Sequence, residues 1–273
     1  MYCTDELISL SKENCSKNET YVQQLSEEYR IDYPSAIGSL IYLLNTRPDL
    51  TFAVTKLAKF MKYPGREHFK ALLRTLKYVR DNANLGLKYY HQWNESPVYT
   101  ILKSNDIMTT HNLFGTHDSS WQDCPDTGKS TGCYIHFMQG GPVDFSTFVP
   151  SPVAMSSAES ETNAGANAAM AMQYIRMIRN ELDGREVDLL TDPPLLMLCD
   201  NSSAVTIANT DKDVKSMRHC KRRLFYMRQL RKEKELMYQY LDNQFMVADI
   251  GTKNLDTTTL QPLIKVIMHS IDD

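Results

Sequence analysis

The chain has 273 residues, of which 42% are hydrophobic and 23% are charged, and its net charge is −3 at pH 7. This composition excludes the collagen-like and intrinsically disordered classes and fits one large or two modest globular domains. The weak negative charge excludes a protein that coats nucleic acid through bulk positive charge. No segment approaches the ~20 apolar residues of a membrane helix, and residues 1–18 lack the apolar core of a signal peptide. We therefore expect an intracellular protein without a membrane partner, in the cytoplasm, a virus-like particle or the nucleus.

The N-terminal third is predicted to be a polar linker, residues 1–31, followed by a small helical module. Apolar residues recur at helical spacing in three segments that are separated by prolines: residues 37–44, 49–61 and 66–80. The outer face of the third segment is basic, which indicates either a phosphate-contacting patch or a solvated helix face. We assign residues 32–105 to this module.

After Gly86 the apolar pattern changes from helical spacing to alternation, which predicts strands. The expected strands are residues 87–90, 99–102, 113–117, 131–138, 143–149, 195–199 and 236–241, and the expected helices are residues 158–182, 201–208, 216–232 and 245–253. Residues 195–199 are apolar throughout, as in a strand buried on both faces. The order of elements predicts an α/β fold with a mixed five-stranded sheet and flanking helices.

Carboxylates recur where such a sheet brings its strand ends together. Asp118 and Asp200 each end a predicted strand, Glu159 or Glu161 begins the long helix, and Asp249 lies in the last helix. Acids without nearby histidine or cysteine ligands suit Mg²⁺ or Mn²⁺. Two such ions roughly 4 Å apart would activate a water and stabilise the leaving 3′-oxygen in phosphodiester cleavage. Taken singly, each acid fits a helix cap or a solvated residue as well.

Six ordered motifs resemble the ribonuclease H domain of copia-type retrotransposon polyproteins. Asp118 lies in Gly115-Thr-His-Asp-Ser-Ser-Trp121, which resembles the family's G-x-[ST]-D-A-[DS]-[WY]. The other five are Ser130-Thr-Gly-Cys-Tyr134, Gly140-Gly-Pro142, Ser156-Ser-Ala-Glu-Ser-Glu161, Cys199-Asp-Asn-Ser-Ser-Ala204 and Ala248-Asp-Ile-Gly-Thr-Lys253. Upstream, Tyr33–Tyr42, Thr46–Asp49 and Pro64–His68 resemble the segment that follows the reverse transcriptase palm. The resemblance covers residues from about 33 to 254.

The resemblance implies a ribonuclease H-like fold in residues 106–256, a reverse-transcriptase-derived connection module in residues 32–105, and a C-terminal tail in residues 257–273. It implies an endonuclease that hydrolyses the RNA strand of RNA–DNA hybrids with two Mg²⁺ or Mn²⁺ ions. The catalytic, metal-binding residues carried over are Asp118, Glu161, Asp200 and Asp249. Glu159 remains an alternative to Glu161, although Ser156-x-x-Glu159 is a capping box and gives Glu159 a structural role. The implied partners are the hybrid and the reverse transcriptase palm of the same polyprotein.

Several departures from the family concern the residues around the acids. Ser146-Thr-Phe148 replaces a basic pair, Met217–Lys221 replaces T-K-H-I-D, and Thr162-Asn163 replaces aromatic residues. We expect substrate contacts from Asn201, Ser202, His219 and Arg222. The departures keep open a non-catalytic scaffold that binds nucleic acid or supports a polymerase, and a helical adaptor built on residues 32–84.

Three other site patterns are set aside on local grounds. Asp126-Thr-Gly128 spells an aspartic-protease triplet but follows Cys124-Pro125 rather than an apolar strand. Gly128-Lys-Ser130 ends like a phosphate-binding loop but lacks the glycine at position 123. The six cysteines form no C-x-x-C pair, so a zinc set of Cys124, Cys133, His219 and Cys220 is not expected.

Overall fold

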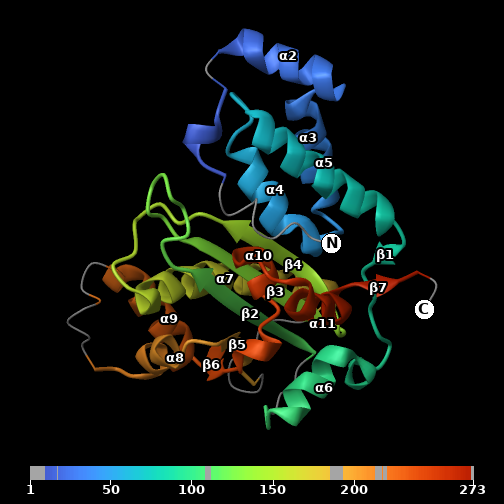
Figure 1. Ribbon diagram of the computed structural model, residues 1–273. Coiled ribbons are helices and arrows are strands. Elements are labelled where there is room, and N and C mark those ends of the chain that lie inside the picture. The colour runs from blue at the N-terminus through green and yellow to red at the C-terminus, as the bar shows by residue number, and fades with distance from the viewer. Residues whose placement is uncertain are drawn as a thin grey trace.

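The computed structural model describes residues 10–16, 18–107, 112–184, 193–212, 217 and 220–271, and it shows a helical module packed on a helix-covered sheet (Figure 1). The helices are α2 (Glu19–Tyr29), α3 (Tyr33–Leu43), α4 (Thr51–Ala58), α5 (Arg66–Asp81), α6 (Pro97–Ser104), α7 (Ser157–Leu182), α8 (Ser202–Asn209), α9 (Lys221–Lys232), α10 (Asp249–Thr252) and α11 (Thr257–Ile267). The strands are β1 (Leu85–Gly86), β2 (Leu113–Ser120), β3 (Thr131–Met138), β4 (Gly141–Phe148), β5 (Leu195–Cys199), β6 (Leu236–Tyr240) and β7 (His269–Ser270). Among these helices, none is long and apolar enough to cross a bilayer.

The central sheet has five strands in the order β4-β3-β2-β5-β6. Strands β2, β3 and β4 form an antiparallel meander, whereas β5 and β6 run parallel to β2. The turn between β3 and β4 places Gln139 and Gly140 at positive φ, as a tight hairpin requires. This arrangement confirms the predicted α/β class and its ribonuclease H-like mixed sheet with flanking helices.

The central strands β2 and β5 are buried on both faces, because alternate residues of a strand point to opposite sides of the sheet and both sides are covered. Leu113, Leu195 and Met197 pack with α7 and α9 on one face. Phe114, Leu196 and Leu198 pack with α6, α10 and α11 on the other. The continuous apolar run of β5 follows directly from this double burial.

The helical module has its own apolar core, formed by α3, α4 and α5 around residues such as Tyr33, Leu57 and Phe69. Leu10 and Leu25 belong to the same core, so the segment that was predicted to be a polar linker contains a helix, α2, packed on the module. Helix α4 of the module packs against β4 and α10 of the sheet domain, and Lys56 on α4 also forms an ion pair with Asp123, which follows β2.

Two predicted strands in the connecting region are wrong. Residues 99–102 belong to α6, which begins at Pro97. The side chain of Ser96, the residue before it, caps the helix by accepting a hydrogen bond from the Tyr99 amide at 3.3 Å. Residues 87–90 form no strand; the neighbouring β1 pairs instead with β7 near the C-terminus. A serine cap and a proline in the first turn favour a helix over the alternation of the following residues.

The C-terminal segments also differ from the prediction. The single helix expected over residues 245–253 is a 3₁₀ turn, Asn243–Phe245, followed by the short α10. Residues 257–271, which were assigned to a tail, contain α11 and β7, and α11 packs into the sheet core through residues such as Leu263 and Ile267. The helix expected from Ser216 is described from Lys221 onward. The division of the chain into domains remains a prediction.

Candidate metal centre

Four buried or half-buried acids meet where β2 and β5 run side by side. Asp118 is the sixth residue of β2, Asp200 directly follows β5, Glu161 lies in the second turn of α7, and Asp249 begins α10. Carboxylate oxygens of Asp118, Glu161 and Asp200 lie within 4.8 Å of one another. The side chains of Asp118, Glu161 and Asp249 are 2%, 4% and 5% exposed, and that of Asp200 is 13% exposed, so the cluster opens to solvent at Asp200.

The long helix α7 directs its two glutamates to different places. Glu161 accepts a hydrogen bond from the Ser119 amide at 3.0 Å, next to Asp118. Glu159 instead accepts from the Met155 amide at 2.7 Å, and its own amide donates to Ser156 Oγ at 3.2 Å. Glu159 therefore stabilises the start of the helix, and Glu161 faces the acid cluster.

Lys253 connects the fourth acid to the others. Its Nζ lies 2.7 Å from Asp249 Oδ1, 3.3 Å from Asp118 Oδ1 and 3.7 Å from Asp200 Oδ2. Asp249 and Lys253 are four residues apart across α10, a spacing that places their side chains on one face. The lysine ammonium thus stands among three carboxylates that come from distant parts of the sequence.

Burial and mutual repulsion favour the protonated acids. Burial and then the charge of Asp118 raise the pKa of Asp249 to about 8. The same two causes raise the pKa of Asp200 and raise that of Glu161 well above its ordinary value. Lys253 opposes these shifts, and its own pKa is raised by the charges of Asp118 and Asp249. The cluster therefore needs positive charge if all of its carboxyl groups are to ionise near neutral pH.

The donor set fits a hard divalent cation. Its donors are carboxylate oxygens, the ligands that Mg²⁺ and Mn²⁺ prefer, and the convergence of Lys253 on them shows that a positive charge is accommodated there. The amide of Asn243, turned to donate, reaches Asp200 Oδ2 at 3.2 Å and Asp249 Oδ2 at 2.9 Å. Thr252 donates its hydroxyl to Asp118 Oδ2. These two contacts orient the acids from outside the cluster.

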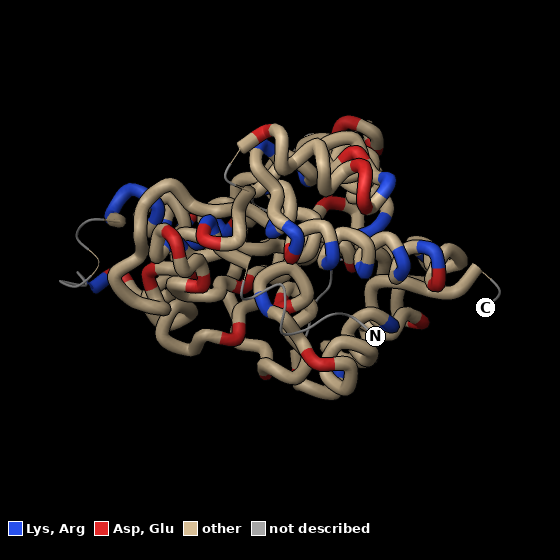
Figure 2. The backbone as a smooth tube through the Cα atoms, turned by 45° about the horizontal axis from the view of Figure 1, so that its top comes forward, with Lys and Arg blue, Asp and Glu red and all other residues tan. Residues whose placement is uncertain are grey.

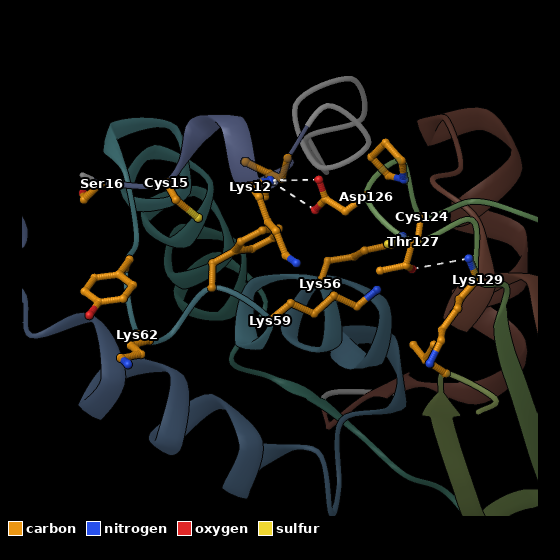
Figure 3. A pocket seen from close by; sticks show the side chains of 15 residues that line it. Lys12, Cys15, Ser16, Lys56, Lys59, Lys62, Cys124, Asp126, Thr127 and Lys129 are labelled. Atoms are coloured by element: carbon orange, nitrogen blue, oxygen red, sulfur yellow. Dashed lines mark hydrogen bonds between the residues drawn. The ribbon is translucent and has the colours of Figure 1, made fainter. Parts of the chain in front are cut away.

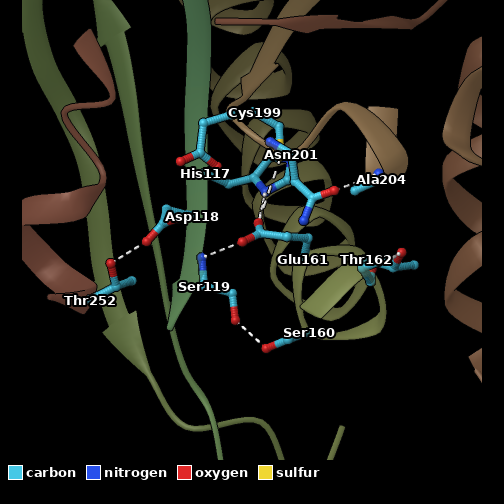
Figure 4. Close-up of polar contacts among 12 residues, drawn as sticks. His117, Asp118, Ser119, Ser160, Glu161, Thr162, Cys199, Asn201, Ala204 and Thr252 are labelled. Carbon is cyan, nitrogen blue, oxygen red and sulfur yellow. Dashed lines mark hydrogen bonds and ion pairs between the residues drawn. The ribbon is translucent and has the colours of Figure 1, made fainter. Parts of the chain in front are cut away.

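Other polar groups surround Glu161 on the α7 side of the sheet. Figure 4 shows Glu161 between the Ser119 backbone and the side chains of His117 and Cys199. Burial lowers the pKa of His117 to about 4, so its imidazole is neutral, and burial raises the pKa of the Cys199 thiol.

The predicted substrate-contact residues lie around this centre in different ways. Asn201 caps α8 by accepting a hydrogen bond from the Ala204 amide at 3.0 Å. Ser202 begins α8 and is exposed. Arg222 is exposed and lines a cavity of about 580 Å³ together with Asn163 and Glu159. His219 lies outside the described residues.

A larger cavity, of about 630 Å³, lies away from the acids, between the helical module and the turn that follows β2 (Figure 3). Lysines line much of it, namely Lys12, Lys56, Lys59, Lys62 and Lys129, and none of the four acids borders it. Its position excludes it as the cleavage site of the four-acid cluster, because a reacting phosphate must lie against the carboxylates.

The basic face of α5 is partly neutralised by its neighbours. Arg66 pairs with Glu28, and Lys70 pairs with Glu67 at 2.8 Å. In the view of Figure 2, basic and acidic residues are interspersed along the backbone. The solvated-face interpretation of this helix therefore gains support over a continuous phosphate-binding stripe.

Sequence reasoning missed Lys253 and Asn243. Lys253 closes the A-D-[IV]-x-T-K motif, and its spacing from Asp249 was a usable signal for an intrahelical pair. Its contacts with Asp118 and Asp200 depend on the sheet topology and had no local signal.

Comparison with known proteins agrees with the motifs. No model of a known protein family matches the chain. The chain is 30% identical to the retrovirus-related Pol polyprotein from transposon RE1 of Arabidopsis thaliana, over 84% of this chain and 14% of that protein. It is 25% identical to the Pol polyprotein from transposon TNT 1-94 of Nicotiana tabacum, over 96% of this chain and 18% of that protein. The crystal structure of prototype foamy virus protease-reverse transcriptase is similar at 14% identity and a TM-score of 0.33, over 82% of this chain and 24% of that one.

The chain thus spans less than a fifth of the length of these polyproteins. The similarity nevertheless runs through both the helical module and the sheet domain, because it covers 84% or more of the chain. The chain belongs to the retrovirus-related Pol polyproteins of transposons, as a segment that contains their ribonuclease H-like region.

Proposed function

We propose that this segment hydrolyses the RNA strand of RNA–DNA hybrids, with two Mg²⁺ or Mn²⁺ ions held by Asp118, Glu161, Asp200 and Asp249. The observation that carries the proposal is the convergence of these acids, three of which place oxygens within 4.8 Å of one another. When bound, the ions would activate the attacking water and stabilise the leaving 3′-oxygen. A cluster of acids at the ends of neighbouring strands is the expected place for such chemistry.

The chain's own groups prepare this centre. The Ser119 amide fixes Glu161, and Thr252 fixes Asp118, so both carboxylates keep one orientation. The amide of Asn243, turned to donate, bridges the carboxylates of Asp200 and Asp249. Because these partners are backbone groups or lie on regular elements, the geometry is set before substrate arrives.

Substrate contacts are proposed for Asn201, Ser202 and Arg222, which lie beyond the acids on α8 and α9. Lys221 and Arg223 line the same cavity as Arg222, so its wall carries positive charge. A phosphate of either strand is the group that such a cavity recognises. We also propose that the helical module contacts the reverse transcriptase palm of the same polyprotein.

A non-catalytic scaffold is the second candidate. The observation in its favour is the neutral Ser146-Thr-Phe148 segment, which lacks the basic pair that the family has beside its acids and so weakens the contact with a hybrid substrate during cleavage. A scaffold of this kind would bind nucleic acid or a polymerase without cleaving the hybrid.

Cleavage of a labelled RNA–DNA hybrid with Mg²⁺ separates the two candidates. We expect RNA fragments from the native chain, and a loss of at least about 100-fold for Asp200→Asn, since even residues that merely support metal ligands typically contribute 10–100-fold. Asp81→Asn is the matched control, because Asp81 is a surface acid paired with Arg80. Equal absence of cleavage in the native chain and Asp200→Asn, with both folded, would leave the scaffold as the function.

A further inference from the structure

Three potential ligand groups converge on the α7 side of the sheet, next to the acid cluster. His117 of β2 and Cys199 of β5 share the strand parity of Leu113 and Met197, so they face α7, from which Glu161 projects toward both. All three side chains are buried, and one donor atom of each lies within 4.8 Å of the other two.

The distances within this group match those around a tetrahedral ion. Cys199 Sγ lies 3.7 Å from Glu161 Oε2, and His117 Nδ1 lies 3.5 Å from the same oxygen. Bond lengths of about 2.3 Å to sulfur and about 2.0 Å to nitrogen or oxygen give tetrahedral edges of about 3.5 Å for S···O and about 3.3 Å for N···O. These two donor–donor distances therefore need to shorten by only a few tenths of an ångström.

His117 has an unused donor or acceptor at this point. Its Nδ1 is buried and has no hydrogen-bond partner among the described residues, because the contact with Glu161 lacks hydrogen-bond geometry. A buried polar atom without a partner is costly, and a coordinated ion would satisfy it. Helix α7 packs tightly against the imidazole, since a Cβ on Gly165 would lie 2.9 Å from His117 Cε1. The ring is thus held in place.

We propose that His117, Cys199 and Glu161 form a second cation site, for a thiophilic divalent ion such as Zn²⁺, distinct from the oxygen-only site for Mg²⁺. Imidazole and thiolate ligands favour Zn²⁺, whereas Mg²⁺ requires oxygen donors. The thiol proton of Cys199 passes to solvent as the S–metal bond forms. A water molecule completes the tetrahedron, and ions enter from the side of Asp200, where the cluster is open.

Glu161 is common to both sites, and this links Zn²⁺ to cleavage. Its Oε2 faces His117 and Cys199, so a Zn²⁺ ion bound there would draw on the charge of the same carboxylate that the Mg²⁺ site needs. Zn²⁺ in the second site therefore weakens Mg²⁺ binding and inhibits the nuclease. This consequence rests on the proposed function, whereas Zn²⁺ binding itself does not.

Cobalt(II) serves as an optical probe of the site, because a Co²⁺–thiolate bond gives a charge-transfer absorption that oxygen ligands do not. We expect this absorption in the native chain and in Cys124→Ser, whose thiol lies in the turn after β2, and its loss in Cys199→Ser. In isothermal titration, His117→Asn should bind Zn²⁺ at least about tenfold more weakly than the native chain. This variant tests the proposal independently if Cys199→Ser does not fold, and an unchanged Zn²⁺ affinity would contradict it.

The outcomes separate this site from the hydrolytic one. Asp200→Asn should lose Mg²⁺-dependent cleavage and keep the Co²⁺–thiolate absorption. Absence of that absorption in the native chain, or its persistence in Cys199→Ser, would overturn the proposal even if the nuclease is active. Absorption in a native chain that does not cleave hybrid would support the cation site and contradict only the proposed function.

Discussion

Replacing Lys253 by methionine tests whether its ammonium acts as the resident counter-cation of the acid cluster. Methionine keeps an unbranched apolar stem and removes the charge that lies 2.7 to 3.7 Å from carboxylate oxygens of Asp249, Asp118 and Asp200. We expect the variant to be less stable than the native chain without divalent ions, and to bind Mg²⁺ more tightly. Both effects have one cause, since the ion and the ammonium compete for the same oxygens.

The magnitude follows from the contacts and their exposure. Removing one partner of a buried ion pair costs about 3–5 kcal/mol. The Lys253 side chain is 32% exposed, so solvent screening lowers the expected loss to about 2–3 kcal/mol. If the ammonium turns to solvent when Mg²⁺ binds, the stability of the bound form is unaffected by the substitution. The metal affinity must then rise by the same free energy, which corresponds to a Kd tighter by about 30–150-fold.

Two measurements check this equality. Urea unfolding in the presence of a chelator gives the loss of stability, and isothermal titration with Mg²⁺ gives the change in Kd. Lys265→Met is the matched control, because Lys265 is an exposed lysine on α11, and it should change neither quantity. Unchanged stability without metal, or weaker Mg²⁺ binding in Lys253→Met, would show that Lys253 does not compete with the ion.

Three further predictions concern the surroundings of the centre. Burial lowers the pKa of His68 from 6.5 to about 4, so His68 takes up a proton in the unfolded chain at a higher pH than in the folded one. The free energy of unfolding therefore falls by up to about 3 kcal/mol as the pH drops from 6.5 to 4. His68→Gln should flatten this dependence on pH, and an unchanged slope would contradict the prediction. Gly251→Ala should lower the stability by about 1–3 kcal/mol in thermal unfolding and reduce cleavage, because the added Cβ would collide with Cys133 and displace α10. Full activity would show that α10 can move without disturbing the acid cluster. Lys56→Met and Asp123→Asn should each lower the free energy of unfolding by about 3 kcal/mol, and the double variant should lose less than the sum of the two. Additive losses in chemical unfolding would show that the ion pair does not dock the module on the sheet domain.

The sheet and two of its acids could be predicted because their signals are local. The apolar run before Asp200 marks a strand buried on both faces, and the residues before Asp118 mark another. Parallel pairing of β2 with β5 then brings the two acids to one end of the sheet. The choice of Glu161 over Glu159 likewise had a local reason, since the capping role of Glu159 is encoded within four residues.

The remaining features depend on competing local signals or on tertiary contacts. Residues 99–102 alternate like a strand, but the cap and proline that precede them fix a helix whose Val98 and Leu102 reach the sheet core. For α11 the signals of cap and periodicity were present, because Asp256 caps it and its apolar residues recur at helical spacing. The meeting of Lys253 with Asp118 could not be read from the sequence, since 134 other residues separate them.

The energetics of the centre favour the nuclease over the scaffold. Bringing four carboxyl groups together under burial opposes their ionisation, as the raised pKa values of Glu161, Asp200 and Asp249 show. A protein that only binds nucleic acid would lose nothing by replacing one of them with an amide, and would gain stability by relieving the repulsion. Lys253 offsets part of this repulsion but leaves the number of acids in excess of the number of cations. An arrangement that is costly without added cations and complementary to them is what a metal-dependent hydrolase requires.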